Sequence, residues 1–112
     1  MAIQIKSKAD AFPTGEAQIY AVPANKAAIV KNLRLVNTHT TQASTVNLYI
    51  KRGTATKRSI CQVDLPIAAK AAYIDDKELT LQYVDASNID EIRGASSGGT
   101  VEYVLSYIER DV

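Results

Sequence analysis

The stretch of residues 20–37, YAVPANKAAIVKNLRLVN, constrains the fold more than any other part of the chain. Pro23 cannot donate a backbone hydrogen bond to a β-ladder, so we expect a first strand to end at Val22. The residues after it supply a turn, in which Asn25 tolerates a positive φ. Residues 27–36 are then apolar and rich in β-branched side chains, which favour a pleated strand. The stretch therefore predicts two strands joined by a tight turn.

Alternating apolar and polar side chains indicate further strands. In residues 45–51, for example, Val46, Leu48 and Ile50 share one face. Turn signals recur about every 8–12 residues, and no long helical period is present. The pattern predicts an all-β chain folded as an antiparallel β-sandwich of jelly-roll-like form, with about eight short strands.

The chain is expected to contain one domain, because its 112 residues bury roughly 65% of the unfolded surface, enough for a single core. Residues 1–16 are expected to be an N-terminal arm and loop, with the loop beginning at residue 7. Residues 17–112 are expected to form the single β-sandwich domain. Only residues 67–72, IAAKAA, offer a helical turn, which is too short to be a stable helix by itself.

Charge, cysteine content and the N-terminal sequence argue against several classes of protein. Lys and Arg total 13 against 12 for Asp and Glu, a net charge of +1, so we do not expect nucleic acid as a partner. A single cysteine allows no internal disulfide. The first residues, MAIQIK, lack the apolar centre of a signal peptide, and no run approaches the roughly 20 apolar residues of a membrane span. We expect a soluble protein made in the cytosol, with no membrane partner.

The residues that most often carry chemistry are scattered. His39 is the only histidine and Cys61 the only cysteine, whereas a zinc site needs three or four convergent ligands. Asp75 and Asp76 lie in an expected turn without the spacing of a calcium-binding loop. We expect His39 to be a solvated turn residue, Cys61 to be part of the core, and the protein to have no metal, no cofactor and no enzymatic activity.

Four basic residues flank one expected hairpin loop: Lys51, Arg52, Lys57 and Arg58. Such a basic knob is a candidate for contact with an acidic partner surface or with nucleic acid. The alternative, which we favour, is that charges at a hairpin tip keep a sheet edge soluble and unpaired.

The final expected strand, residues 100–109, is apolar on both faces. One face carries four candidate subunit-interface residues: Val101, Tyr103, Leu105 and Tyr107. Val104 and Ile108 make the other face apolar as well, whereas a sandwich strand normally buries only one face. A partner subunit could bury the second face, and tyrosine is enriched in interfaces. Alternatively, the strand curls into a small barrel or is covered by the N-terminal arm. On the first interpretation we expect a homotrimer, because three copies around an axis close the assembly.

Several motifs resemble those of small β-sandwich proteins from tailed-phage virions. The matching residues, within about 17–109, are Tyr20-x-Val22-Pro23-Ala24-x-Lys26-x-Ala28-Ile29-Val30-Lys31, Leu33-Arg34-Leu35-x-Asn37, Val46-x-Leu48-Tyr49, Leu79-x-Leu81, Asp85, Ile89, Ala95-Ser96 and Val101-x-Tyr103-x-Leu105. In that family a VPAGK turn precedes a long core strand. Here Asn25 replaces the turn glycine, and Val84-Asp85-Ala86 stands where Ala-Gly-Asp is more usual.

The resemblance implies a structural protein of the phage virion, made in the host cytoplasm. It implies most concretely a capsid decoration, or cement, protein that binds and stabilises the assembled shell. Its partners would be the major capsid protein or other virion proteins. A tail, neck or fibre component is the alternative within this class. A carbohydrate-binding β-sandwich is a more remote alternative, because such sites use exposed aromatic platforms and the chain has no tryptophan. No catalytic residues carry over, since these relatives act by binding.

Overall fold

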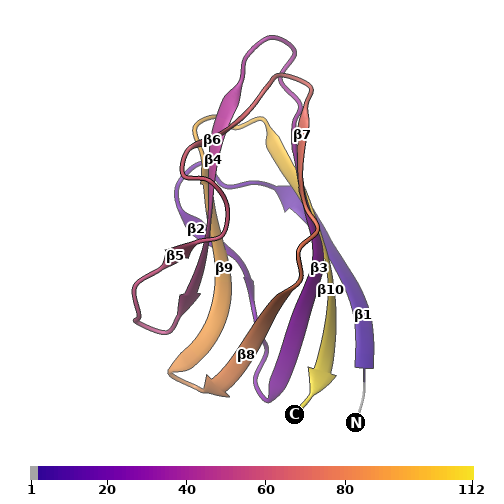
Figure 1. Cartoon of the computed structure of the whole chain (residues 1–112), viewed down its shortest axis with the longest axis vertical. Helices are drawn as coiled ribbons and strands as arrows, with labels where there is room; N and C mark the ends of the chain where they lie inside the picture. Colours follow the sequence, from indigo (N-terminus) through magenta and orange to yellow (C-terminus); the bar gives the residue numbers. More distant parts are fainter. Residues whose placement is uncertain (1–2) are drawn as a thin grey trace.

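The computed structural model describes residues 3–112, which form ten β-strands and no helix (Figure 1). In chain order they are β1 (Ile3–Ala11), β2 (Ala17–Ala21), β3 (Lys26–Asn37), β4 (Ser44–Arg52), β5 (Arg58–Ser59), β6 (Leu65–Ile67), β7 (Ala72–Asp75), β8 (Leu79–Asp85), β9 (Asn88–Ser96) and β10 (Val101–Asp111). Each pairing between these strands is antiparallel.

The strands are arranged in two layers that face each other (Figure 1). One layer contains β1, β10, β3, β7 and β8. The other contains β2, β9, β4, β5 and β6. The β8–β9 hairpin connects the layers, so that a single hydrogen-bonded sheet folds over on itself. The predicted all-β antiparallel sandwich is confirmed, with ten strands in place of about eight.

The turn after Pro23 has the predicted conformation. Asn25 has a φ of 60°, and the Lys26 N–H donates to the Pro23 carbonyl oxygen at 3.2 Å. The turn leads into β3, which is 12 residues long and occupies the centre of its layer. One edge of β3 pairs with β10, and the other pairs with β8 and then β7.

The core lies between the layers, because alternate side chains of β3, β4, β9 and β10 point inward. Its largest fully buried apolar side chains are Ile19, Leu35, Val46, Leu48, Leu81, Ile92, Val101 and Leu105. Phe12 joins this core immediately after β1 ends. It packs over Gly94, where a Cβ atom would lie within 3.0 Å of the Phe12 ring. The end of β1 is therefore fixed by a buried aromatic ring.

Two expectations from the sequence are wrong. The loop expected from residue 7 onward begins only after Ala11, because β1 continues through it in an unbroken pairing with β10. Main-chain bonds hold this strand, so its polar side chains do not prevent it from forming. The helical turn expected at residues 67–72 is absent: β6 ends at Ile67, and a turn with Lys70 at a φ of 62° leads into β7.

Candidate interaction surface

The four residues expected at a subunit interface point into the chain's own core. Val101, Tyr103, Leu105 and Tyr107 are buried between the layers. The Tyr103 ring meets Phe12 edge to face, and the Tyr107 ring centroid lies 4.6 Å from that of Tyr20. These four residues therefore do not face a partner subunit, and the face of β10 left for a partner is the opposite one, with Val104 and Ile108. The homotrimer stays a prediction that rests on this second face.

The opposite side of β1, β10, β3 and β7 is a mostly apolar surface, which we call the outer face. It is defined by seven side chains: Ile3, Ile5, Ile29, Val36, Ile74, Val104 and Ile108. Ile5, Ile108 and Ile29 are successive cross-strand partners, so they form a row across three strands. Ile3 and Ile5 are 67% and 87% exposed. A polar row of Ser7, Ser106 and Asn32 separates this isoleucine row from Val104 and Val36. Exposed apolar side chains gathered in this way on one face indicate an interaction surface.

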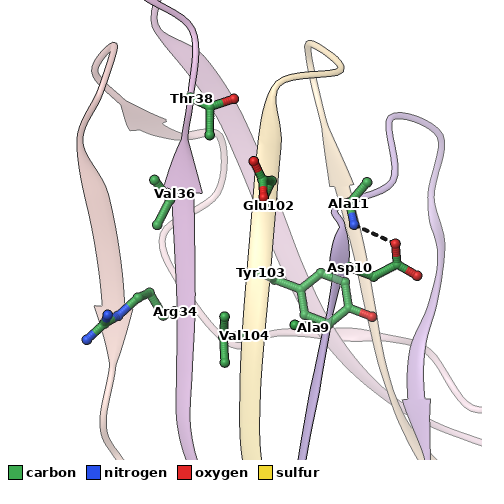
Figure 2. Close-up of a pocket in the computed structure, with 9 residues that line it drawn as sticks. All are labelled: Ala9, Asp10, Ala11, Arg34, Val36, Thr38, Glu102, Tyr103 and Val104. Carbon is green, nitrogen blue, oxygen red and sulfur yellow. Dashed lines mark hydrogen bonds between the residues drawn. The ribbon is translucent and has the colours of Figure 1, made fainter.

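A shallow hollow of about 510 Å³ lies at one end of the outer face (Figure 2). Small side chains form it: Ala9 and Ala11 of β1, Val104 of β10 and Val36 of β3. Because alanine and valine project little above the backbone, the sheet itself is the floor of the hollow. This shape suits an apolar projection from a partner more than a polar small molecule.

Two opposite charges flank the hollow. Arg34 extends away from Val104, whereas Glu102 lies toward Thr38 (Figure 2). Both side chains are exposed, and within residues 3–112 neither forms an ion pair. A partner that covers this surface would therefore need apolar contacts and complementary charges to bind well.

The four basic residues flank the hairpin of β4 and β5 as expected, but two of them form ion pairs with acidic residues. Arg52 donates to both carboxylate oxygens of Asp90, at 2.7 and 2.9 Å. Lys57 pairs with Glu16, and its Nζ lies 4.3 Å from the centroid of the Tyr49 ring. Of these four residues, Lys51 and Arg58 form no ion pair within residues 3–112. The hairpin is thus a weaker basic patch than the sequence suggests.

A buried carboxylate, which the sequence did not reveal, ties three strands together. Glu109 of β10 is 2% exposed. It accepts a hydrogen bond from the Tyr20 hydroxyl of β2, and its Oε1 lies 2.8 Å from Nζ of Lys6 on β1. Burial by itself raises the pKa of Glu109, but the contacts with Lys6 and Tyr20 outweigh it and hold the pKa below its ordinary value. Glu109 is therefore ionised at neutral pH and closes one side of the sandwich.

Asp90 is a second buried acid. Besides Arg52, its carboxylate accepts a hydrogen bond from the Gln82 backbone N–H at 2.9 Å. Burial raises the pKa of Asp90, and the bonds from Arg52 and Gln82 more than reverse that effect. The group joins β9, β4 and β8, and its geometry is that of a structural ion pair.

His39 and Cys61 lie apart from each other, and each contributes to local structure. His39 Nδ1 accepts hydrogen bonds from the backbone N–H groups of Thr41 and Gln42, at 3.0 and 2.9 Å, so it stabilises its own turn. Cys61 is half-buried, and burial raises the pKa of its thiol. Residues 3–112 contain no cluster of metal-binding side chains. The same residues include no helix able to span a membrane.

Comparison with known proteins adds one informative likeness. No known protein family matches the chain, and no curated protein matches it. The fold is similar to a chain in the structure described as the acidic stable capsid of Helicobacter pylori bacteriophage KHP30, with a TM-score of 0.53 and 16% identity. The similarity covers 97% of this chain and 87% of that one. At this identity the comparison establishes a shared fold over nearly the whole chain.

Proposed function

We propose that the protein is a structural component of a bacteriophage virion. The observation that carries this proposal is the fold shared, along 97% of the chain, with a chain from a phage capsid structure. The motif at residues 20–37, which resembles small virion proteins, supports it from the sequence. The first observation rests on backbone geometry and the second on residue identity.

Within the virion, the proposed role is capsid decoration: the protein binds the assembled shell and stabilises it. A subunit that bridges neighbouring shell proteins binds the assembled state better than its parts, and mass action then favours the assembled state. The proposed role is binding, without catalysis. The scattered positions of His39 and Cys61, each with a structural environment, support this choice.

The outer face is the proposed contact with the shell. It combines exposed apolar side chains with a hollow that can receive a projection from a partner. Full burial of one isoleucine or valine side chain contributes about 1.5–3 kcal/mol, so a few such contacts suffice for specific attachment. Each bound subunit would then add a small amount to the stability of the shell, and this contribution would be repeated at many sites.

The test uses capsids that lack the protein. Added protein should bind them and raise their disruption temperature. Val104→Asp, in the hollow, should weaken binding at least about tenfold, because a carboxylate would be buried without a partner. Val63→Asp is the matched control, since Val63 is an exposed apolar residue outside the outer face, and it should bind normally.

Two outcomes would contradict the decoration role. The first is that added purified protein leaves the disruption temperature of the capsids unchanged. The second is that the protein co-purifies with tails alone. Copy number and location on the particle then separate the alternatives, because a decoration protein repeats over the many equivalent sites of the shell, whereas a neck or fibre component occupies a few sites at one vertex.

A further inference from the structure

β1 is the longest unpaired sheet edge among the ten described strands. It is nine residues long, pairs with β10 on one side only, and is the outermost strand of its layer (Figure 1). The other edge strands are short: β5, β6 and β7 have two, three and four residues. β2 has five, with an irregularity in its pairing. Since exposed edges bind other strands, natural proteins usually keep them short or block them.

The hydrogen-bonding pattern identifies the backbone groups that face outward. The Phe12 N–H donates to the Val101 carbonyl oxygen at 2.8 Å, and Phe12 continues the register of β1 with β10. Bonded pairs alternate along an antiparallel ladder, so the even-numbered residues of β1 bond to β10. The N–H and C=O groups of Ile3, Ile5, Ser7 and Ala9 therefore point to the open edge.

The usual means of blocking an edge are missing from most of β1. Its sequence has no proline or glycine, and its pairing with β10 contains no bulge. Its lysines do not guard the edge, because Lys6 pairs with the buried Glu109 and Lys8 donates to the Ile19 carbonyl at 2.6 Å. Only the end is blocked: the Ala11 N–H donates to the Asp10 carboxylate at 2.7 Å. The open edge therefore spans Ile3 to Ala9.

We propose that the occupant of this edge is β1 of a second copy of the chain, paired antiparallel about a twofold axis at Ile5. An edge strand is self-complementary under such an axis, because each copy offers the donors and acceptors that the other lacks. Pairing at Ile5 also covers the most exposed large apolar side chain with its own counterpart. The result is a continuous sheet across the dimer, with neither copy keeping an open β1 edge.

Hydrogen-bond number and side-chain charge together select this register among the neighbouring ones. An axis at Gln4 brings no charges together, but it pairs only Ile3 with Ile5 among the described residues, with about four main-chain hydrogen bonds. With the axis at Ile5, Ile3 faces Ser7 of the second copy and Gln4 faces Lys6, with about six main-chain hydrogen bonds in total. An axis at Lys6 would place the two Lys6 side chains opposite each other. An axis at Ser7 would twice place Lys6 opposite Lys8. Like charges directly opposite are destabilising, so the axis at Ile5 is favoured.

The first experiment measures the mass of the free protein by sedimentation up to about 1 mM, where even weak specific association is detected. We expect a dimer of about 24 kDa, twice the 12.1 kDa of one chain. Ile5→Lys should weaken dimerisation at least about tenfold by placing two charges at the axis. Ile5→Pro should also weaken dimerisation, because it removes the Ile5 N–H that points to the open edge and leaves the hydrogen bonds to β10 intact. Val63→Lys, an equally apolar exposed site elsewhere, should have no effect.

The second experiment tests the register with single cysteines in a Cys61→Ser background. At the axis, the two Ile5 Cα atoms would lie about 5.5 Å apart, within the range of a disulfide. Ile5→Cys should therefore form a disulfide-linked dimer under mild oxidation. Ser7→Cys lies on the same face of the same strand, but the Cα atoms of the two copies would be about 14 Å apart and should stay unlinked.

Four outcomes would overturn the proposal: a monomer at every concentration, a trimer, a dimer insensitive to both Ile5 substitutions, or equal linking by the two cysteines. The proposal does not depend on the virion role, because both experiments use the free protein. Failure to bind capsids would leave it standing, and a monomeric protein could still bind a shell through the outer face.

Discussion

Glu109→Gln is the most informative single substitution, because it removes one charge and almost no volume from a buried contact. The glutamine keeps an oxygen that can accept the bond from Tyr20, but it no longer attracts Lys6. A hydrogen bond to a charged group contributes about 1.5–3 kcal/mol, against about 0.5–1.5 for a neutral one. We therefore expect the free energy of unfolding to fall by about 1–2 kcal/mol at neutral pH.

The sign of the pH dependence follows from the lowered pKa of Glu109. Because its folded pKa lies below the ordinary value of 4.5, the unfolded chain takes up this proton first as the pH falls. The stabilisation is thus fully present above about pH 4.5 and is lost as the pH falls through the folded pKa. The pKa of Asp90 is also lowered, so Asp90 contributes a pH dependence of the same sign. Because Asp90 is present in both proteins, its contribution cancels in the difference between the variant and the wild type.

The assay is urea unfolding followed by circular dichroism, at about pH 7 and about pH 3. At neutral pH the midpoint should fall by about 0.5–1.5 M urea, and the difference from the wild type should shrink at low pH. Glu102→Gln is the matched control on the same strand, because Glu102 is exposed and should change stability by less than about 0.5 kcal/mol. An equal difference at both pH values would refute the assignment of an ionised, paired Glu109.

Three further predictions concern stability, each measured by denaturant unfolding. Gly94→Ala should cost about 1–3 kcal/mol, because its Cβ would displace the Phe12 ring, whereas Gly99→Ala has no neighbour within 4 Å and should be close to neutral. Asn25→Ala should cost about 1 kcal/mol or more at a φ of 60°, and Asn25→Gly should retain the wild-type stability. Leu105→Ala, fully buried in β10, should cost about 2–5 kcal/mol without changing the β-rich spectrum.

Local signals in the sequence were sufficient for the fold class. Pro23 and Asn25 define a turn through backbone chemistry that needs no distant partner, and the structure confirms it. The strict alternation of Val46 and Leu48 likewise places both in the core. By contrast, residues 7–11 form a strand through main-chain bonds to β10, and their exposed side chains carry no apolar periodicity that would indicate it.

The interaction surface was harder to predict, because both faces of β10 are apolar. Whether Tyr103 or Val104 faces the core depends on which side the second layer covers, and no local pattern decides that. Glu109 illustrates the same limit: its partners, Tyr20 and Lys6, are brought to it only by the pairing of distant strands. The one available signal was that Glu109 shares the alternation of Val101, Tyr103, Leu105 and Tyr107, which places it on their face of the strand.

The central position of β10 in its layer has a consequence for how the chain folds. β1 and β3 both pair with β10, the last of the ten strands to leave the ribosome. Most of this layer therefore cannot assemble until β10 has been synthesised, and folding dominated by such distant pairings takes milliseconds to seconds. During that interval Ile3 and Ile5 lie on an unpaired nascent segment, so the yield of folded protein should fall as expression becomes faster or warmer.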